Sequence, residues 1–205
     1  MGQIVNYLKE TPSQTAGPYV HIGLAPGAAG FETYEQEFGW DITGPNAKGE
    51  RIRVEGLVID GTGSPIKDVM LEVWQANADG NYAHPEGGPV EEGFRGWGRV
   101  LTDFETGEWA FETVKPGATK GREGALMAPH INLWIVARGI NVGLNTRMYF
   151  DDEADANAKD GVMSLVEWEN RRGTLVATRS LRDDQIIYRF DIRVQGDGET
   201  VFFDI

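Results

Sequence analysis

The chain has 205 residues, contains no cysteine and carries a formal net charge of −13 at pH 7. This length suits one domain with a substantial core. The lack of cysteine excludes disulfides, thiolate nucleophiles and Cys-based zinc or iron–sulfur sites. The acidic excess argues against nucleic acid, whose phosphate backbone requires a basic face, and against anionic membranes.

The first thirty residues show neither a targeting signal nor a regular element. Residues 1–10 lack a basic segment followed by an apolar one, and no apolar run in the chain approaches the ~20 residues that span a bilayer. We therefore expect a cytoplasmic chain. Residues 11–20 contain two prolines and a glycine without a helical or strand period. Residues 1–30 are accordingly predicted to form an extended, irregular N-terminal arm.

From residue 51 onward, the alternation of apolar and polar residues predicts β-strands. Residues 51–60 begin with clean alternation of charged and apolar side chains. A hairpin turn is expected at Glu105-Thr106-Gly107. The other expected strands are residues 69–74, 98–103, 108–114, 130–138, 144–150, 185–194 and 199–205.

Helical signals are few. Residues 151–159 have acidic side chains in the first turn and Lys159 at the end, as the helix dipole favours. Residues 165–172 predict a second short helix, bounded by Gly173. Together these elements predict a mainly β fold, an antiparallel β-sandwich with long loops and one or two short helices. We expect a single domain over residues 1–205, with the sandwich core in residues 51–205.

The chain contains three histidines, His21, His84 and His130, and none is paired with another at a helical or strand spacing. Considered alone, each is more often a hydrogen-bonding residue than a metal ligand. The motifs around them are more informative. Five short segments, in this order and spacing, resemble the intradiol ring-cleaving dioxygenases: LEVWQAN at 71–77, GRVLTD at 98–103, TVKPG at 113–117, PHIN at 129–132 and MYFDD at 148–152.

The resemblance implies a ferric site built from two tyrosines and two histidines, of which half is missing here. Tyr82 and His130 stand at two ligand positions, whereas Thr119 lies in the stretch where a second tyrosine is expected, and Asn132 replaces the second histidine. Met127 stands where catalytic members carry an arginine. We predict that this chain binds no metal and that Tyr82 and His130 hydrogen-bond in a collapsed pocket. The alternative is a self-sufficient dioxygenase in which Thr119 and Asn132 supply neutral oxygens to the iron.

Two-chain members of the family pair an iron-bearing β chain with a related α chain that lacks iron. Residues 11–24, 137–141 and the C-terminal residues 195–205 resemble the latter kind. The resemblance implies a β-chain partner that holds Fe(III), and higher-order assembly of αβ units. It also implies an active site at the αβ interface, where protocatechuate is cleaved with O2 to 3-carboxy-cis,cis-muconate in aromatic catabolism.

By the same resemblance, this chain contributes Thr15, Gly17, Pro18 and Arg138 to the substrate cavity. An arginine can pair with the carboxylate of such a substrate, and glycine and proline let the backbone approach a flat ring closely. The alternative interpretation of Arg138 is that it is a strand-end residue that pairs with a surface carboxylate. The alternative interpretation of Gly17-Pro18 is that it forms a simple turn. The alternative for the whole chain is a β-sandwich structural or binding module with no role in catalysis.

Overall fold

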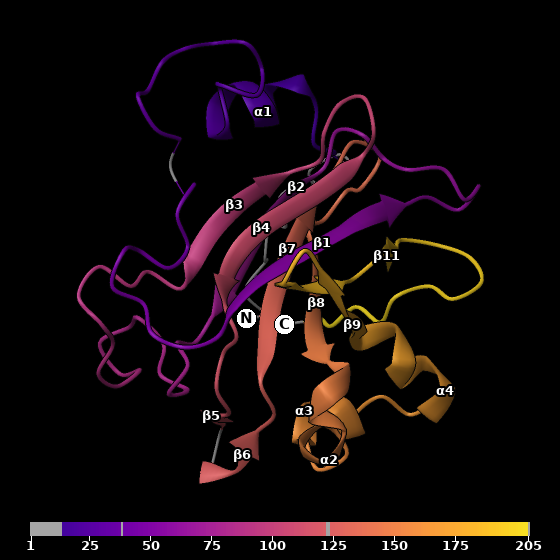
Figure 1. Ribbon diagram of the computed structural model, residues 1–205. Helices are drawn as coiled ribbons and strands as arrows, with labels where there is room; N and C mark the ends of the chain where they lie inside the picture. Colours follow the sequence, from indigo (N-terminus) through magenta and orange to yellow (C-terminus); the bar gives the residue numbers. More distant parts are fainter. Residues whose placement is uncertain (1–13, 38, 122–123, 205) are drawn as a thin grey trace, which may run out of the picture.

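The computed structural model describes residues 14–37, 39–121 and 124–204, and these form a mainly β fold, as predicted (Figure 1). The strands are β1 Arg51–Ile59, β2 Met70–Gln75, β3 Trp97–Leu101, β4 Glu108–Val114, β5 Thr119–Lys120, β6 Leu126–Met127, β7 His130–Val136, β8 Leu144–Phe150, β9 Val176–Arg182, β10 Gln185–Arg189 and β11 Ile192–Arg193. The helices are α1 Pro18–Leu24, α2 Ala154–Asn157, α3 Gly161–Ser164 and α4 Glu169–Arg172, with 3-10 turns η2 Asp151–Glu153 and η3 Gly173–Leu175.

Nine of the strands form one mixed sheet in the order β11-β1-β10-β9-β8-β7-β2-β3, with β4 paired to β1, and β5 pairs with β6 separately. Most neighbours are antiparallel, as predicted, but β1 runs parallel to β10 and β11, and β8 runs parallel to β9. The predicted antiparallel β-sandwich is therefore confirmed as a mainly β, sandwich-like fold, in which these parallel pairs make the sheet mixed. Local alternation reports which side of a strand is buried but does not report the direction of a partner that is distant in the sequence.

The sheet folds over a main apolar core, beside which lies a smaller apolar cluster that includes Tyr149 and Leu175, and the arrangement is sandwich-like. Strand β1 alternates between buried and partly exposed residues along its length, which matches the two-residue period of a strand. Buried side chains of β1, β4 and β10 share one cluster with those of β2, β7 and β8. Its largest fully buried members include Trp109, Phe150 and Tyr188. The rings of Phe150 and Tyr188 meet edge to face with centroids 4.8 Å apart, a favoured aromatic geometry.

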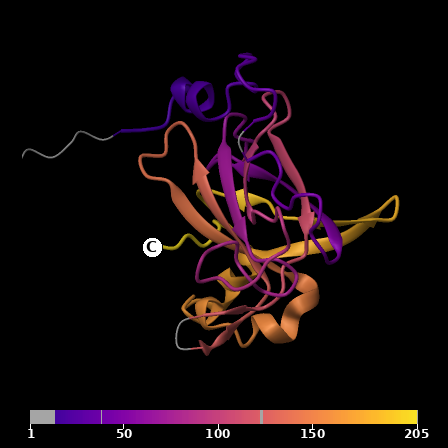
Figure 2. The same ribbon diagram turned by 90° about the vertical axis from the view of Figure 1, so that its left-hand side faces the viewer.

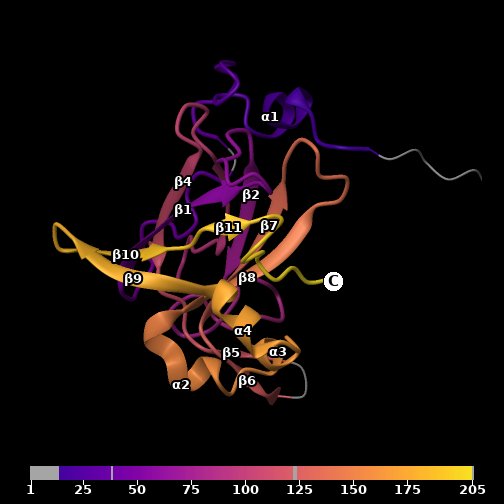
Figure 3. The same ribbon diagram turned by 90° about the vertical axis from the view of Figure 1, so that its right-hand side faces the viewer.

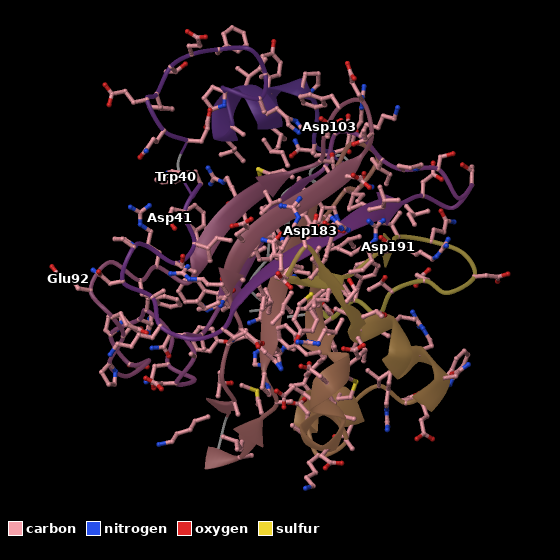
Figure 4. The ribbon with its side chains drawn as sticks, viewed as in Figure 1. Trp40, Asp41, Glu92, Asp103, Asp183 and Asp191 are labelled. Atoms are coloured by element: carbon pink, nitrogen blue, oxygen red, sulfur yellow. The ribbon has the colours of Figure 1, made fainter. Side chains whose placement is uncertain are left out.

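Turns in this fold are held by aspartates. The predicted turn between β3 and β4 is present, but the two strands do not form a hairpin, because β3 pairs with β2 and β4 pairs with β1. In this turn the Asp103 carboxylate accepts backbone N–H bonds from Glu105 at 2.9 Å and Thr106 at 2.7 Å (Figure 4). Strands β9 and β10 form a hairpin that projects from the body (Figure 3). Asp183 and Asp184 occupy its turn with φ of 49° and 66°, the left-handed conformation that short hairpin turns require and that aspartate tolerates.

Two C-terminal strand predictions needed correction. The strand predicted over residues 185–194 is divided at Phe190 and Asp191 into β10 and β11. The Asp191 carboxylate accepts the Leu57 N–H at 2.9 Å, so both halves remain beside β1 (Figure 4). The strand predicted over residues 199–205 is not formed in residues 199–204, which make only an isolated bridge between Asn145 and Phe203. Its backbone instead bonds to separate groups, such as the Arg193 carbonyl.

The helical predictions were correct in kind but not in extent. Residues 151–159 form a 3-10 turn followed by the four-residue α2, and the helix predicted over residues 165–172 is limited to α4. The prediction of an irregular arm over residues 1–30 was also wrong in part, because α1 begins at Pro18. Proline is favoured at the first helical position because its missing N–H has no partner there. Residues 1–13 of the arm lie outside the described residues.

Helix α1 and the short helices α2 to α4 lie at opposite ends of the molecule (Figures 1 and 2). Strand β7 runs between these ends. His130 begins β7, and Arg138 follows two residues after its end at Val136, so the two residues are separated by about 26 Å at the usual rise per strand residue. One strand therefore carries a former ligand position at one end and a predicted substrate contact at the other.

No helix of the described residues is long and apolar enough to cross a membrane.

Candidate functional site

The former ligand positions Tyr82, His130 and Asn132 come together at the start of β7. His130 and Asn132 lie on the same face of the strand because they are two residues apart, and Tyr82 lies on the loop after β2. The Tyr82 ring stacks on Trp74 with centroids 5.6 Å apart and planes 9° apart. The Tyr82 hydroxyl is 3.0 Å from His130 Nε2, which is the hydrogen bond predicted for a metal-free pair.

The hydrogen-bond partners determine the tautomer of His130. Its Nδ1 lies 2.7 Å from the Ala128 carbonyl, which can only accept, so Nδ1 carries the proton. Nε2 is therefore bare and accepts from the Tyr82 hydroxyl. His130 is fully buried, and burial, assisted by the nearby Arg147 charge, lowers its pKa to about 4. The imidazole is consequently neutral at pH 7.

The chain of hydrogen bonds continues through Asn132 to Arg147. Asn132 Nδ2 donates to the Tyr82 hydroxyl at 3.2 Å, and Asn132 Oδ1 accepts from Arg147 Nε at 3.0 Å. Arg147 lies on β8 directly opposite Asn132 on β7. Burial raises the pKa of Tyr82, and the bond from Asn132 and the Arg147 charge oppose that effect only in part. Each polar group in this series of hydrogen bonds thus meets a complementary partner, and Tyr82 remains a neutral phenol.

These residues do not fit a ferric ion. The Nε2 lone pair of His130 that would bind metal accepts the Tyr82 proton instead, and Tyr82 is not a phenolate. Asn132 offers a neutral oxygen, which Arg147 already uses. The Arg147 guanidinium also places a positive charge beside the pocket, which opposes a second cation. Within the described ranges, no three His, Cys, Asp or Glu side chains are grouped as metal ligands.

Thr119, the fourth position, is separate from this network. It begins β5, is 1 % exposed, and its hydroxyl has no hydrogen-bond partner among the described residues. It lines a cavity of about 650 Å³ together with Tyr82 and His84. The structure therefore brings Tyr82, His130 and Asn132 into contact, whereas Thr119 lies on the other side of Tyr82, in a space that the network leaves open.

The predicted substrate contacts gather at the other end of β7. Gly17, Pro18 and Arg138 line one cavity of about 340 Å³, together with His21 and Asp68. Thr15 connects the arm to the turn after β7, because its hydroxyl accepts the Gly139 N–H at 2.8 Å and donates to the Ile140 carbonyl at 3.2 Å. All four residues predicted from the sequence thus lie in one region, although Arg138 is at least 120 positions from the other three in the chain.

Arg138 pairs with a carboxylate, as one of the two sequence interpretations expects. Its Nη2 lies 2.5 Å from Asp68 Oδ2, and the arginine side chain stays 67 % exposed. One carboxylate occupies only part of the five N–H donors of a guanidinium, so the remaining donors are open to solvent. His21 packs nearby, and burial lowers its pKa, while Asp68 acts in the opposite direction and Arg138 reinforces the shift.

Comparison with known proteins identifies the fold and its relatives. A family model described as Dioxygenase matches residues 40–196. The protocatechuate 3,4-dioxygenase alpha chain of Pseudomonas putida is 54 % identical over 200 residues, which cover 98 % of each chain. The chain belongs to the intradiol dioxygenase family.

Two further members of the family extend this comparison. The protocatechuate 3,4-dioxygenase beta chain of Burkholderia cepacia is 34 % identical, over 76 % of this chain and 63 % of that one. Among solved structures, 3-chlorocatechol 1,2-dioxygenase from Rhodococcus opacus 1CP superposes with a TM-score of 0.59 at 17 % identity, covering 85 % of this chain and 79 % of that chain. At that identity the structural likeness supports the intradiol dioxygenase fold alone.

Arg147 and Asp68 were not predicted as site residues. Arg147 is the only charged residue among residues 144–150, and this charge was the available signal. Its role depends on the register that places it opposite Asn132. Asp68 precedes β2 in a loop, and no local pattern distinguishes it from other surface carboxylates.

Proposed function

We propose that this chain is the non-iron α subunit of a protocatechuate 3,4-dioxygenase, inactive alone and paired with a homologous iron-bearing β chain. The main support for this proposal is the 54 % identity to a protocatechuate 3,4-dioxygenase alpha chain over nearly the whole length of both proteins. The lack of fit between the residues at the former ligand positions and a ferric ion supports a metal held by the partner. The weaker likeness to a beta chain is consistent with two related subunits.

In this proposal, the end of β7 beside α1 forms one wall of the substrate cavity. Thr15 holds the arm against the turn after β7, while Gly17 and Pro18 present a rigid backbone to the flat ring. The exposed donors of Arg138 face the substrate carboxylate. The ferric ion of the partner supplies activation of the bound catechol toward O2, and the complex releases 3-carboxy-cis,cis-muconate.

The proposal includes the organisation of the protein. Residues 1–205 act as one domain, cytoplasmic in location, whose arm reaches the partner. The family match over residues 40–196 spans most of this length without interruption. Several αβ units assemble into a closed particle, since a repeated heterologous contact closes into a ring when its rotation permits.

The test is the iron content and protocatechuate-dependent O2 uptake of this chain alone and after co-expression with a β chain. We expect iron and turnover only in the co-expressed complex. Stoichiometric iron with turnover in the isolated chain would establish a self-sufficient dioxygenase. A β chain that is fully active without this chain would instead favour a structural module.

A further inference from the structure

A third cavity is lined by the outer face of β7 and β8 and by residues of α3 and the β5–β6 pair. Helix α3 and the β5–β6 pair lie together at one end of the molecule (Figures 1 and 3). The volume of this cavity is about 960 Å³, which lies within the roughly 300–1,000 Å³ of small-molecule sites. The walls are mainly apolar and include Trp74, Trp97, Trp134 and Leu126. The cavity is distinct from the one beside Arg138, because its lining on β7 extends only as far as Trp134, whereas that of the other begins at Val136.

Arg147 is the cation at the floor of this cavity, and its guanidinium is only partly engaged. Nε donates to Asn132 Oδ1 at 3.0 Å, Nη1 lies 3.6 Å from the Met127 sulfur, and the group also lies beside the Tyr149 hydroxyl. All three partners are uncharged. Among the residues that the structure describes, no carboxylate lies within the 4.0 Å of an ion pair with Arg147.

The carboxylates near Arg147 are already used by other donors. Glu72 lines the wall, but its carboxylate is 2.8 Å from Arg99 and is committed to that pair. The buried Asp160 shares the Tyr149 hydroxyl with Arg147, but its two oxygens also accept three backbone N–H groups. Lys159 adds a positive charge and the exposed Asp204 a negative one, so their contributions to the charge of the cavity cancel. Among the described residues, the half-buried Arg147 guanidinium therefore has no direct ion pair, and an anionic ligand would offset part of its desolvation cost.

We propose that this cavity binds a small planar aromatic carboxylate, with the carboxylate paired to the Arg147 guanidinium and the ring lying among the tryptophans. Arginine presents a flat fork of N–H donors that matches a carboxylate, and indole rings provide stacking surfaces for an arene. The bound ligand undergoes no reaction, because the adjacent tyrosine and imidazole are neutral and bonded to each other. The proposed anion site thus borders the former ligand positions at Asn132 and is separate from the site of turnover.

The test is ¹⁹F NMR of 4-fluorobenzoate titrated into the purified complex of this chain with its iron-bearing partner. Ligand at a ferric centre is broadened by the paramagnetic ion, whereas ligand in this cavity gives a sharp bound resonance. We expect that sharp resonance in the wild-type complex. Arg147→Gln should raise its dissociation constant at least tenfold, and 4-fluorobenzamide, which lacks the charge, should not produce it.

Matched variants keep the test decisive. Arg193→Gln makes the same change in charge at an exposed residue outside the cavity and should leave the sharp resonance intact. Leu165→Glu places a negative charge at the 73 % exposed rim residue, without disturbing the core, and should weaken binding several-fold. Absence of the sharp resonance, or its persistence in both Arg147→Gln and Leu165→Glu, would overturn the proposal. Either result leaves the iron content and O2 uptake of the complex unchanged, so the proposed function is judged separately.

Discussion

His130 occupies a fully buried position in which both ring nitrogens have neutral partners. This environment favours the uncharged imidazole, whose pKa falls to about 4. In the unfolded chain the same group titrates near its ordinary value of 6.5. The difference makes this one side chain a measurable contributor to the pH dependence of stability.

Between pH 6.5 and about 4 the unfolded chain binds a proton at His130 that the folded chain does not. The free energy of unfolding should therefore decrease as the pH falls through this window, by about 3 kcal/mol over its full width. His130→Gln removes this contribution. We expect denaturant titrations at several pH values to show a shallower decrease for the variant than for the wild type. Equal slopes in the two proteins would contradict a buried neutral His130.

Arg138 provides a second prediction for a single residue. Arg138→Ala removes the exposed donors assigned to the substrate carboxylate and should raise the KM for protocatechuate about tenfold, as for a lost hydrogen bond to a charged group. Iron content should not change, since the ferric ion is assigned to the partner. Arg138→Lys, which keeps the charge without the fork, should have an intermediate effect. Steady-state O2 uptake together with metal analysis separates these outcomes from misassembly, in which iron would fall as well.

Only some of the residues in the hydrogen-bond network at the start of β7 could be predicted from the sequence. Tyr82, His130 and Asn132 could be assigned from their order and spacing because each stands within a short recognisable segment. Arg147 could not, because its contact with Asn132 depends on the pairing register of β7 and β8. The burial pattern excludes a one-residue shift in register, which would turn Arg147 to the core face. A shift of two residues would keep the faces but place Arg147 opposite a residue other than Asn132, and neither strand's own sequence excludes it.

Among the elements, the segment from α2 to α3 is organised by the buried Asp160. Its carboxylate accepts from the backbone N–H groups of Ala128, Val162 and Met163 and from the Tyr149 hydroxyl, at 2.8 to 2.9 Å. One side chain thus caps α3 and joins it to β8 and to the segment just before β7. Lys115 connects the other side of this region, through Asp152 and Glu153.

Asp160→Ala should destabilise the protein by about 3 kcal/mol, because it removes a helix cap and leaves buried donors without an acceptor. Asp155→Ala serves as a control, since Asp155 is an exposed acidic residue for which no side-chain bond is found in the described region. Unfolding in denaturant measures both changes. A loss for Asp160→Ala no larger than that for Asp155→Ala would show that this carboxylate does not organise the segment.

Strands were predicted best where the apolar residues recur with a period of two. Residues 108–114 and 144–150 were both predicted with their observed bounds. In the first, Trp109 and Phe111 alternate with more exposed neighbours and mark one buried face. Helix α1 is only seven residues long, and its proline start was hidden in a segment rich in turn residues. The missing strand over residues 199–204 shows the opposite error, in which alternation is present but no neighbouring edge accepts the ladder.

At the scale of the whole molecule, the arm connects parts that are remote in sequence. Thr15 bonds to Gly139 and Ile140, and α1 covers the cavity beside Arg138. The arm is therefore expected to organise the end of the molecule that faces the partner. The cavity at Arg147 has no lining residue from the described part of the arm, and α1 lies at the opposite end of the molecule from α2 to α4 (Figure 2).

Deleting residues 1–18 should reduce both the assembled fraction of the complex and its affinity for protocatechuate, because the contact of Thr15 with the β7 turn and the Gly17-Pro18 wall are lost. Light scattering measures the size of the complex, and O2 uptake measures the affinity. The substitution Thr15→Val retains the arm but removes its hydrogen bonds, and we expect a smaller effect on KM. Unchanged size and kinetics after the deletion would refute the role of the arm.

The closed hydrogen-bond chain from Ala128 to Arg147 also has an evolutionary consequence. Asn132→His alone would remove the acceptor of Arg147 and the donor to Tyr82, without supplying the fourth ligand at Thr119. Thr119→Tyr alone would leave His130 bonded to Tyr82 and the guanidinium in place. Neither single reversion therefore restores a metal site: the first breaks two hydrogen bonds, and the second leaves the whole network in place. Iron binding would return to this chain only through several simultaneous changes, so the division of labour between two chains is hard to reverse by stepwise mutation.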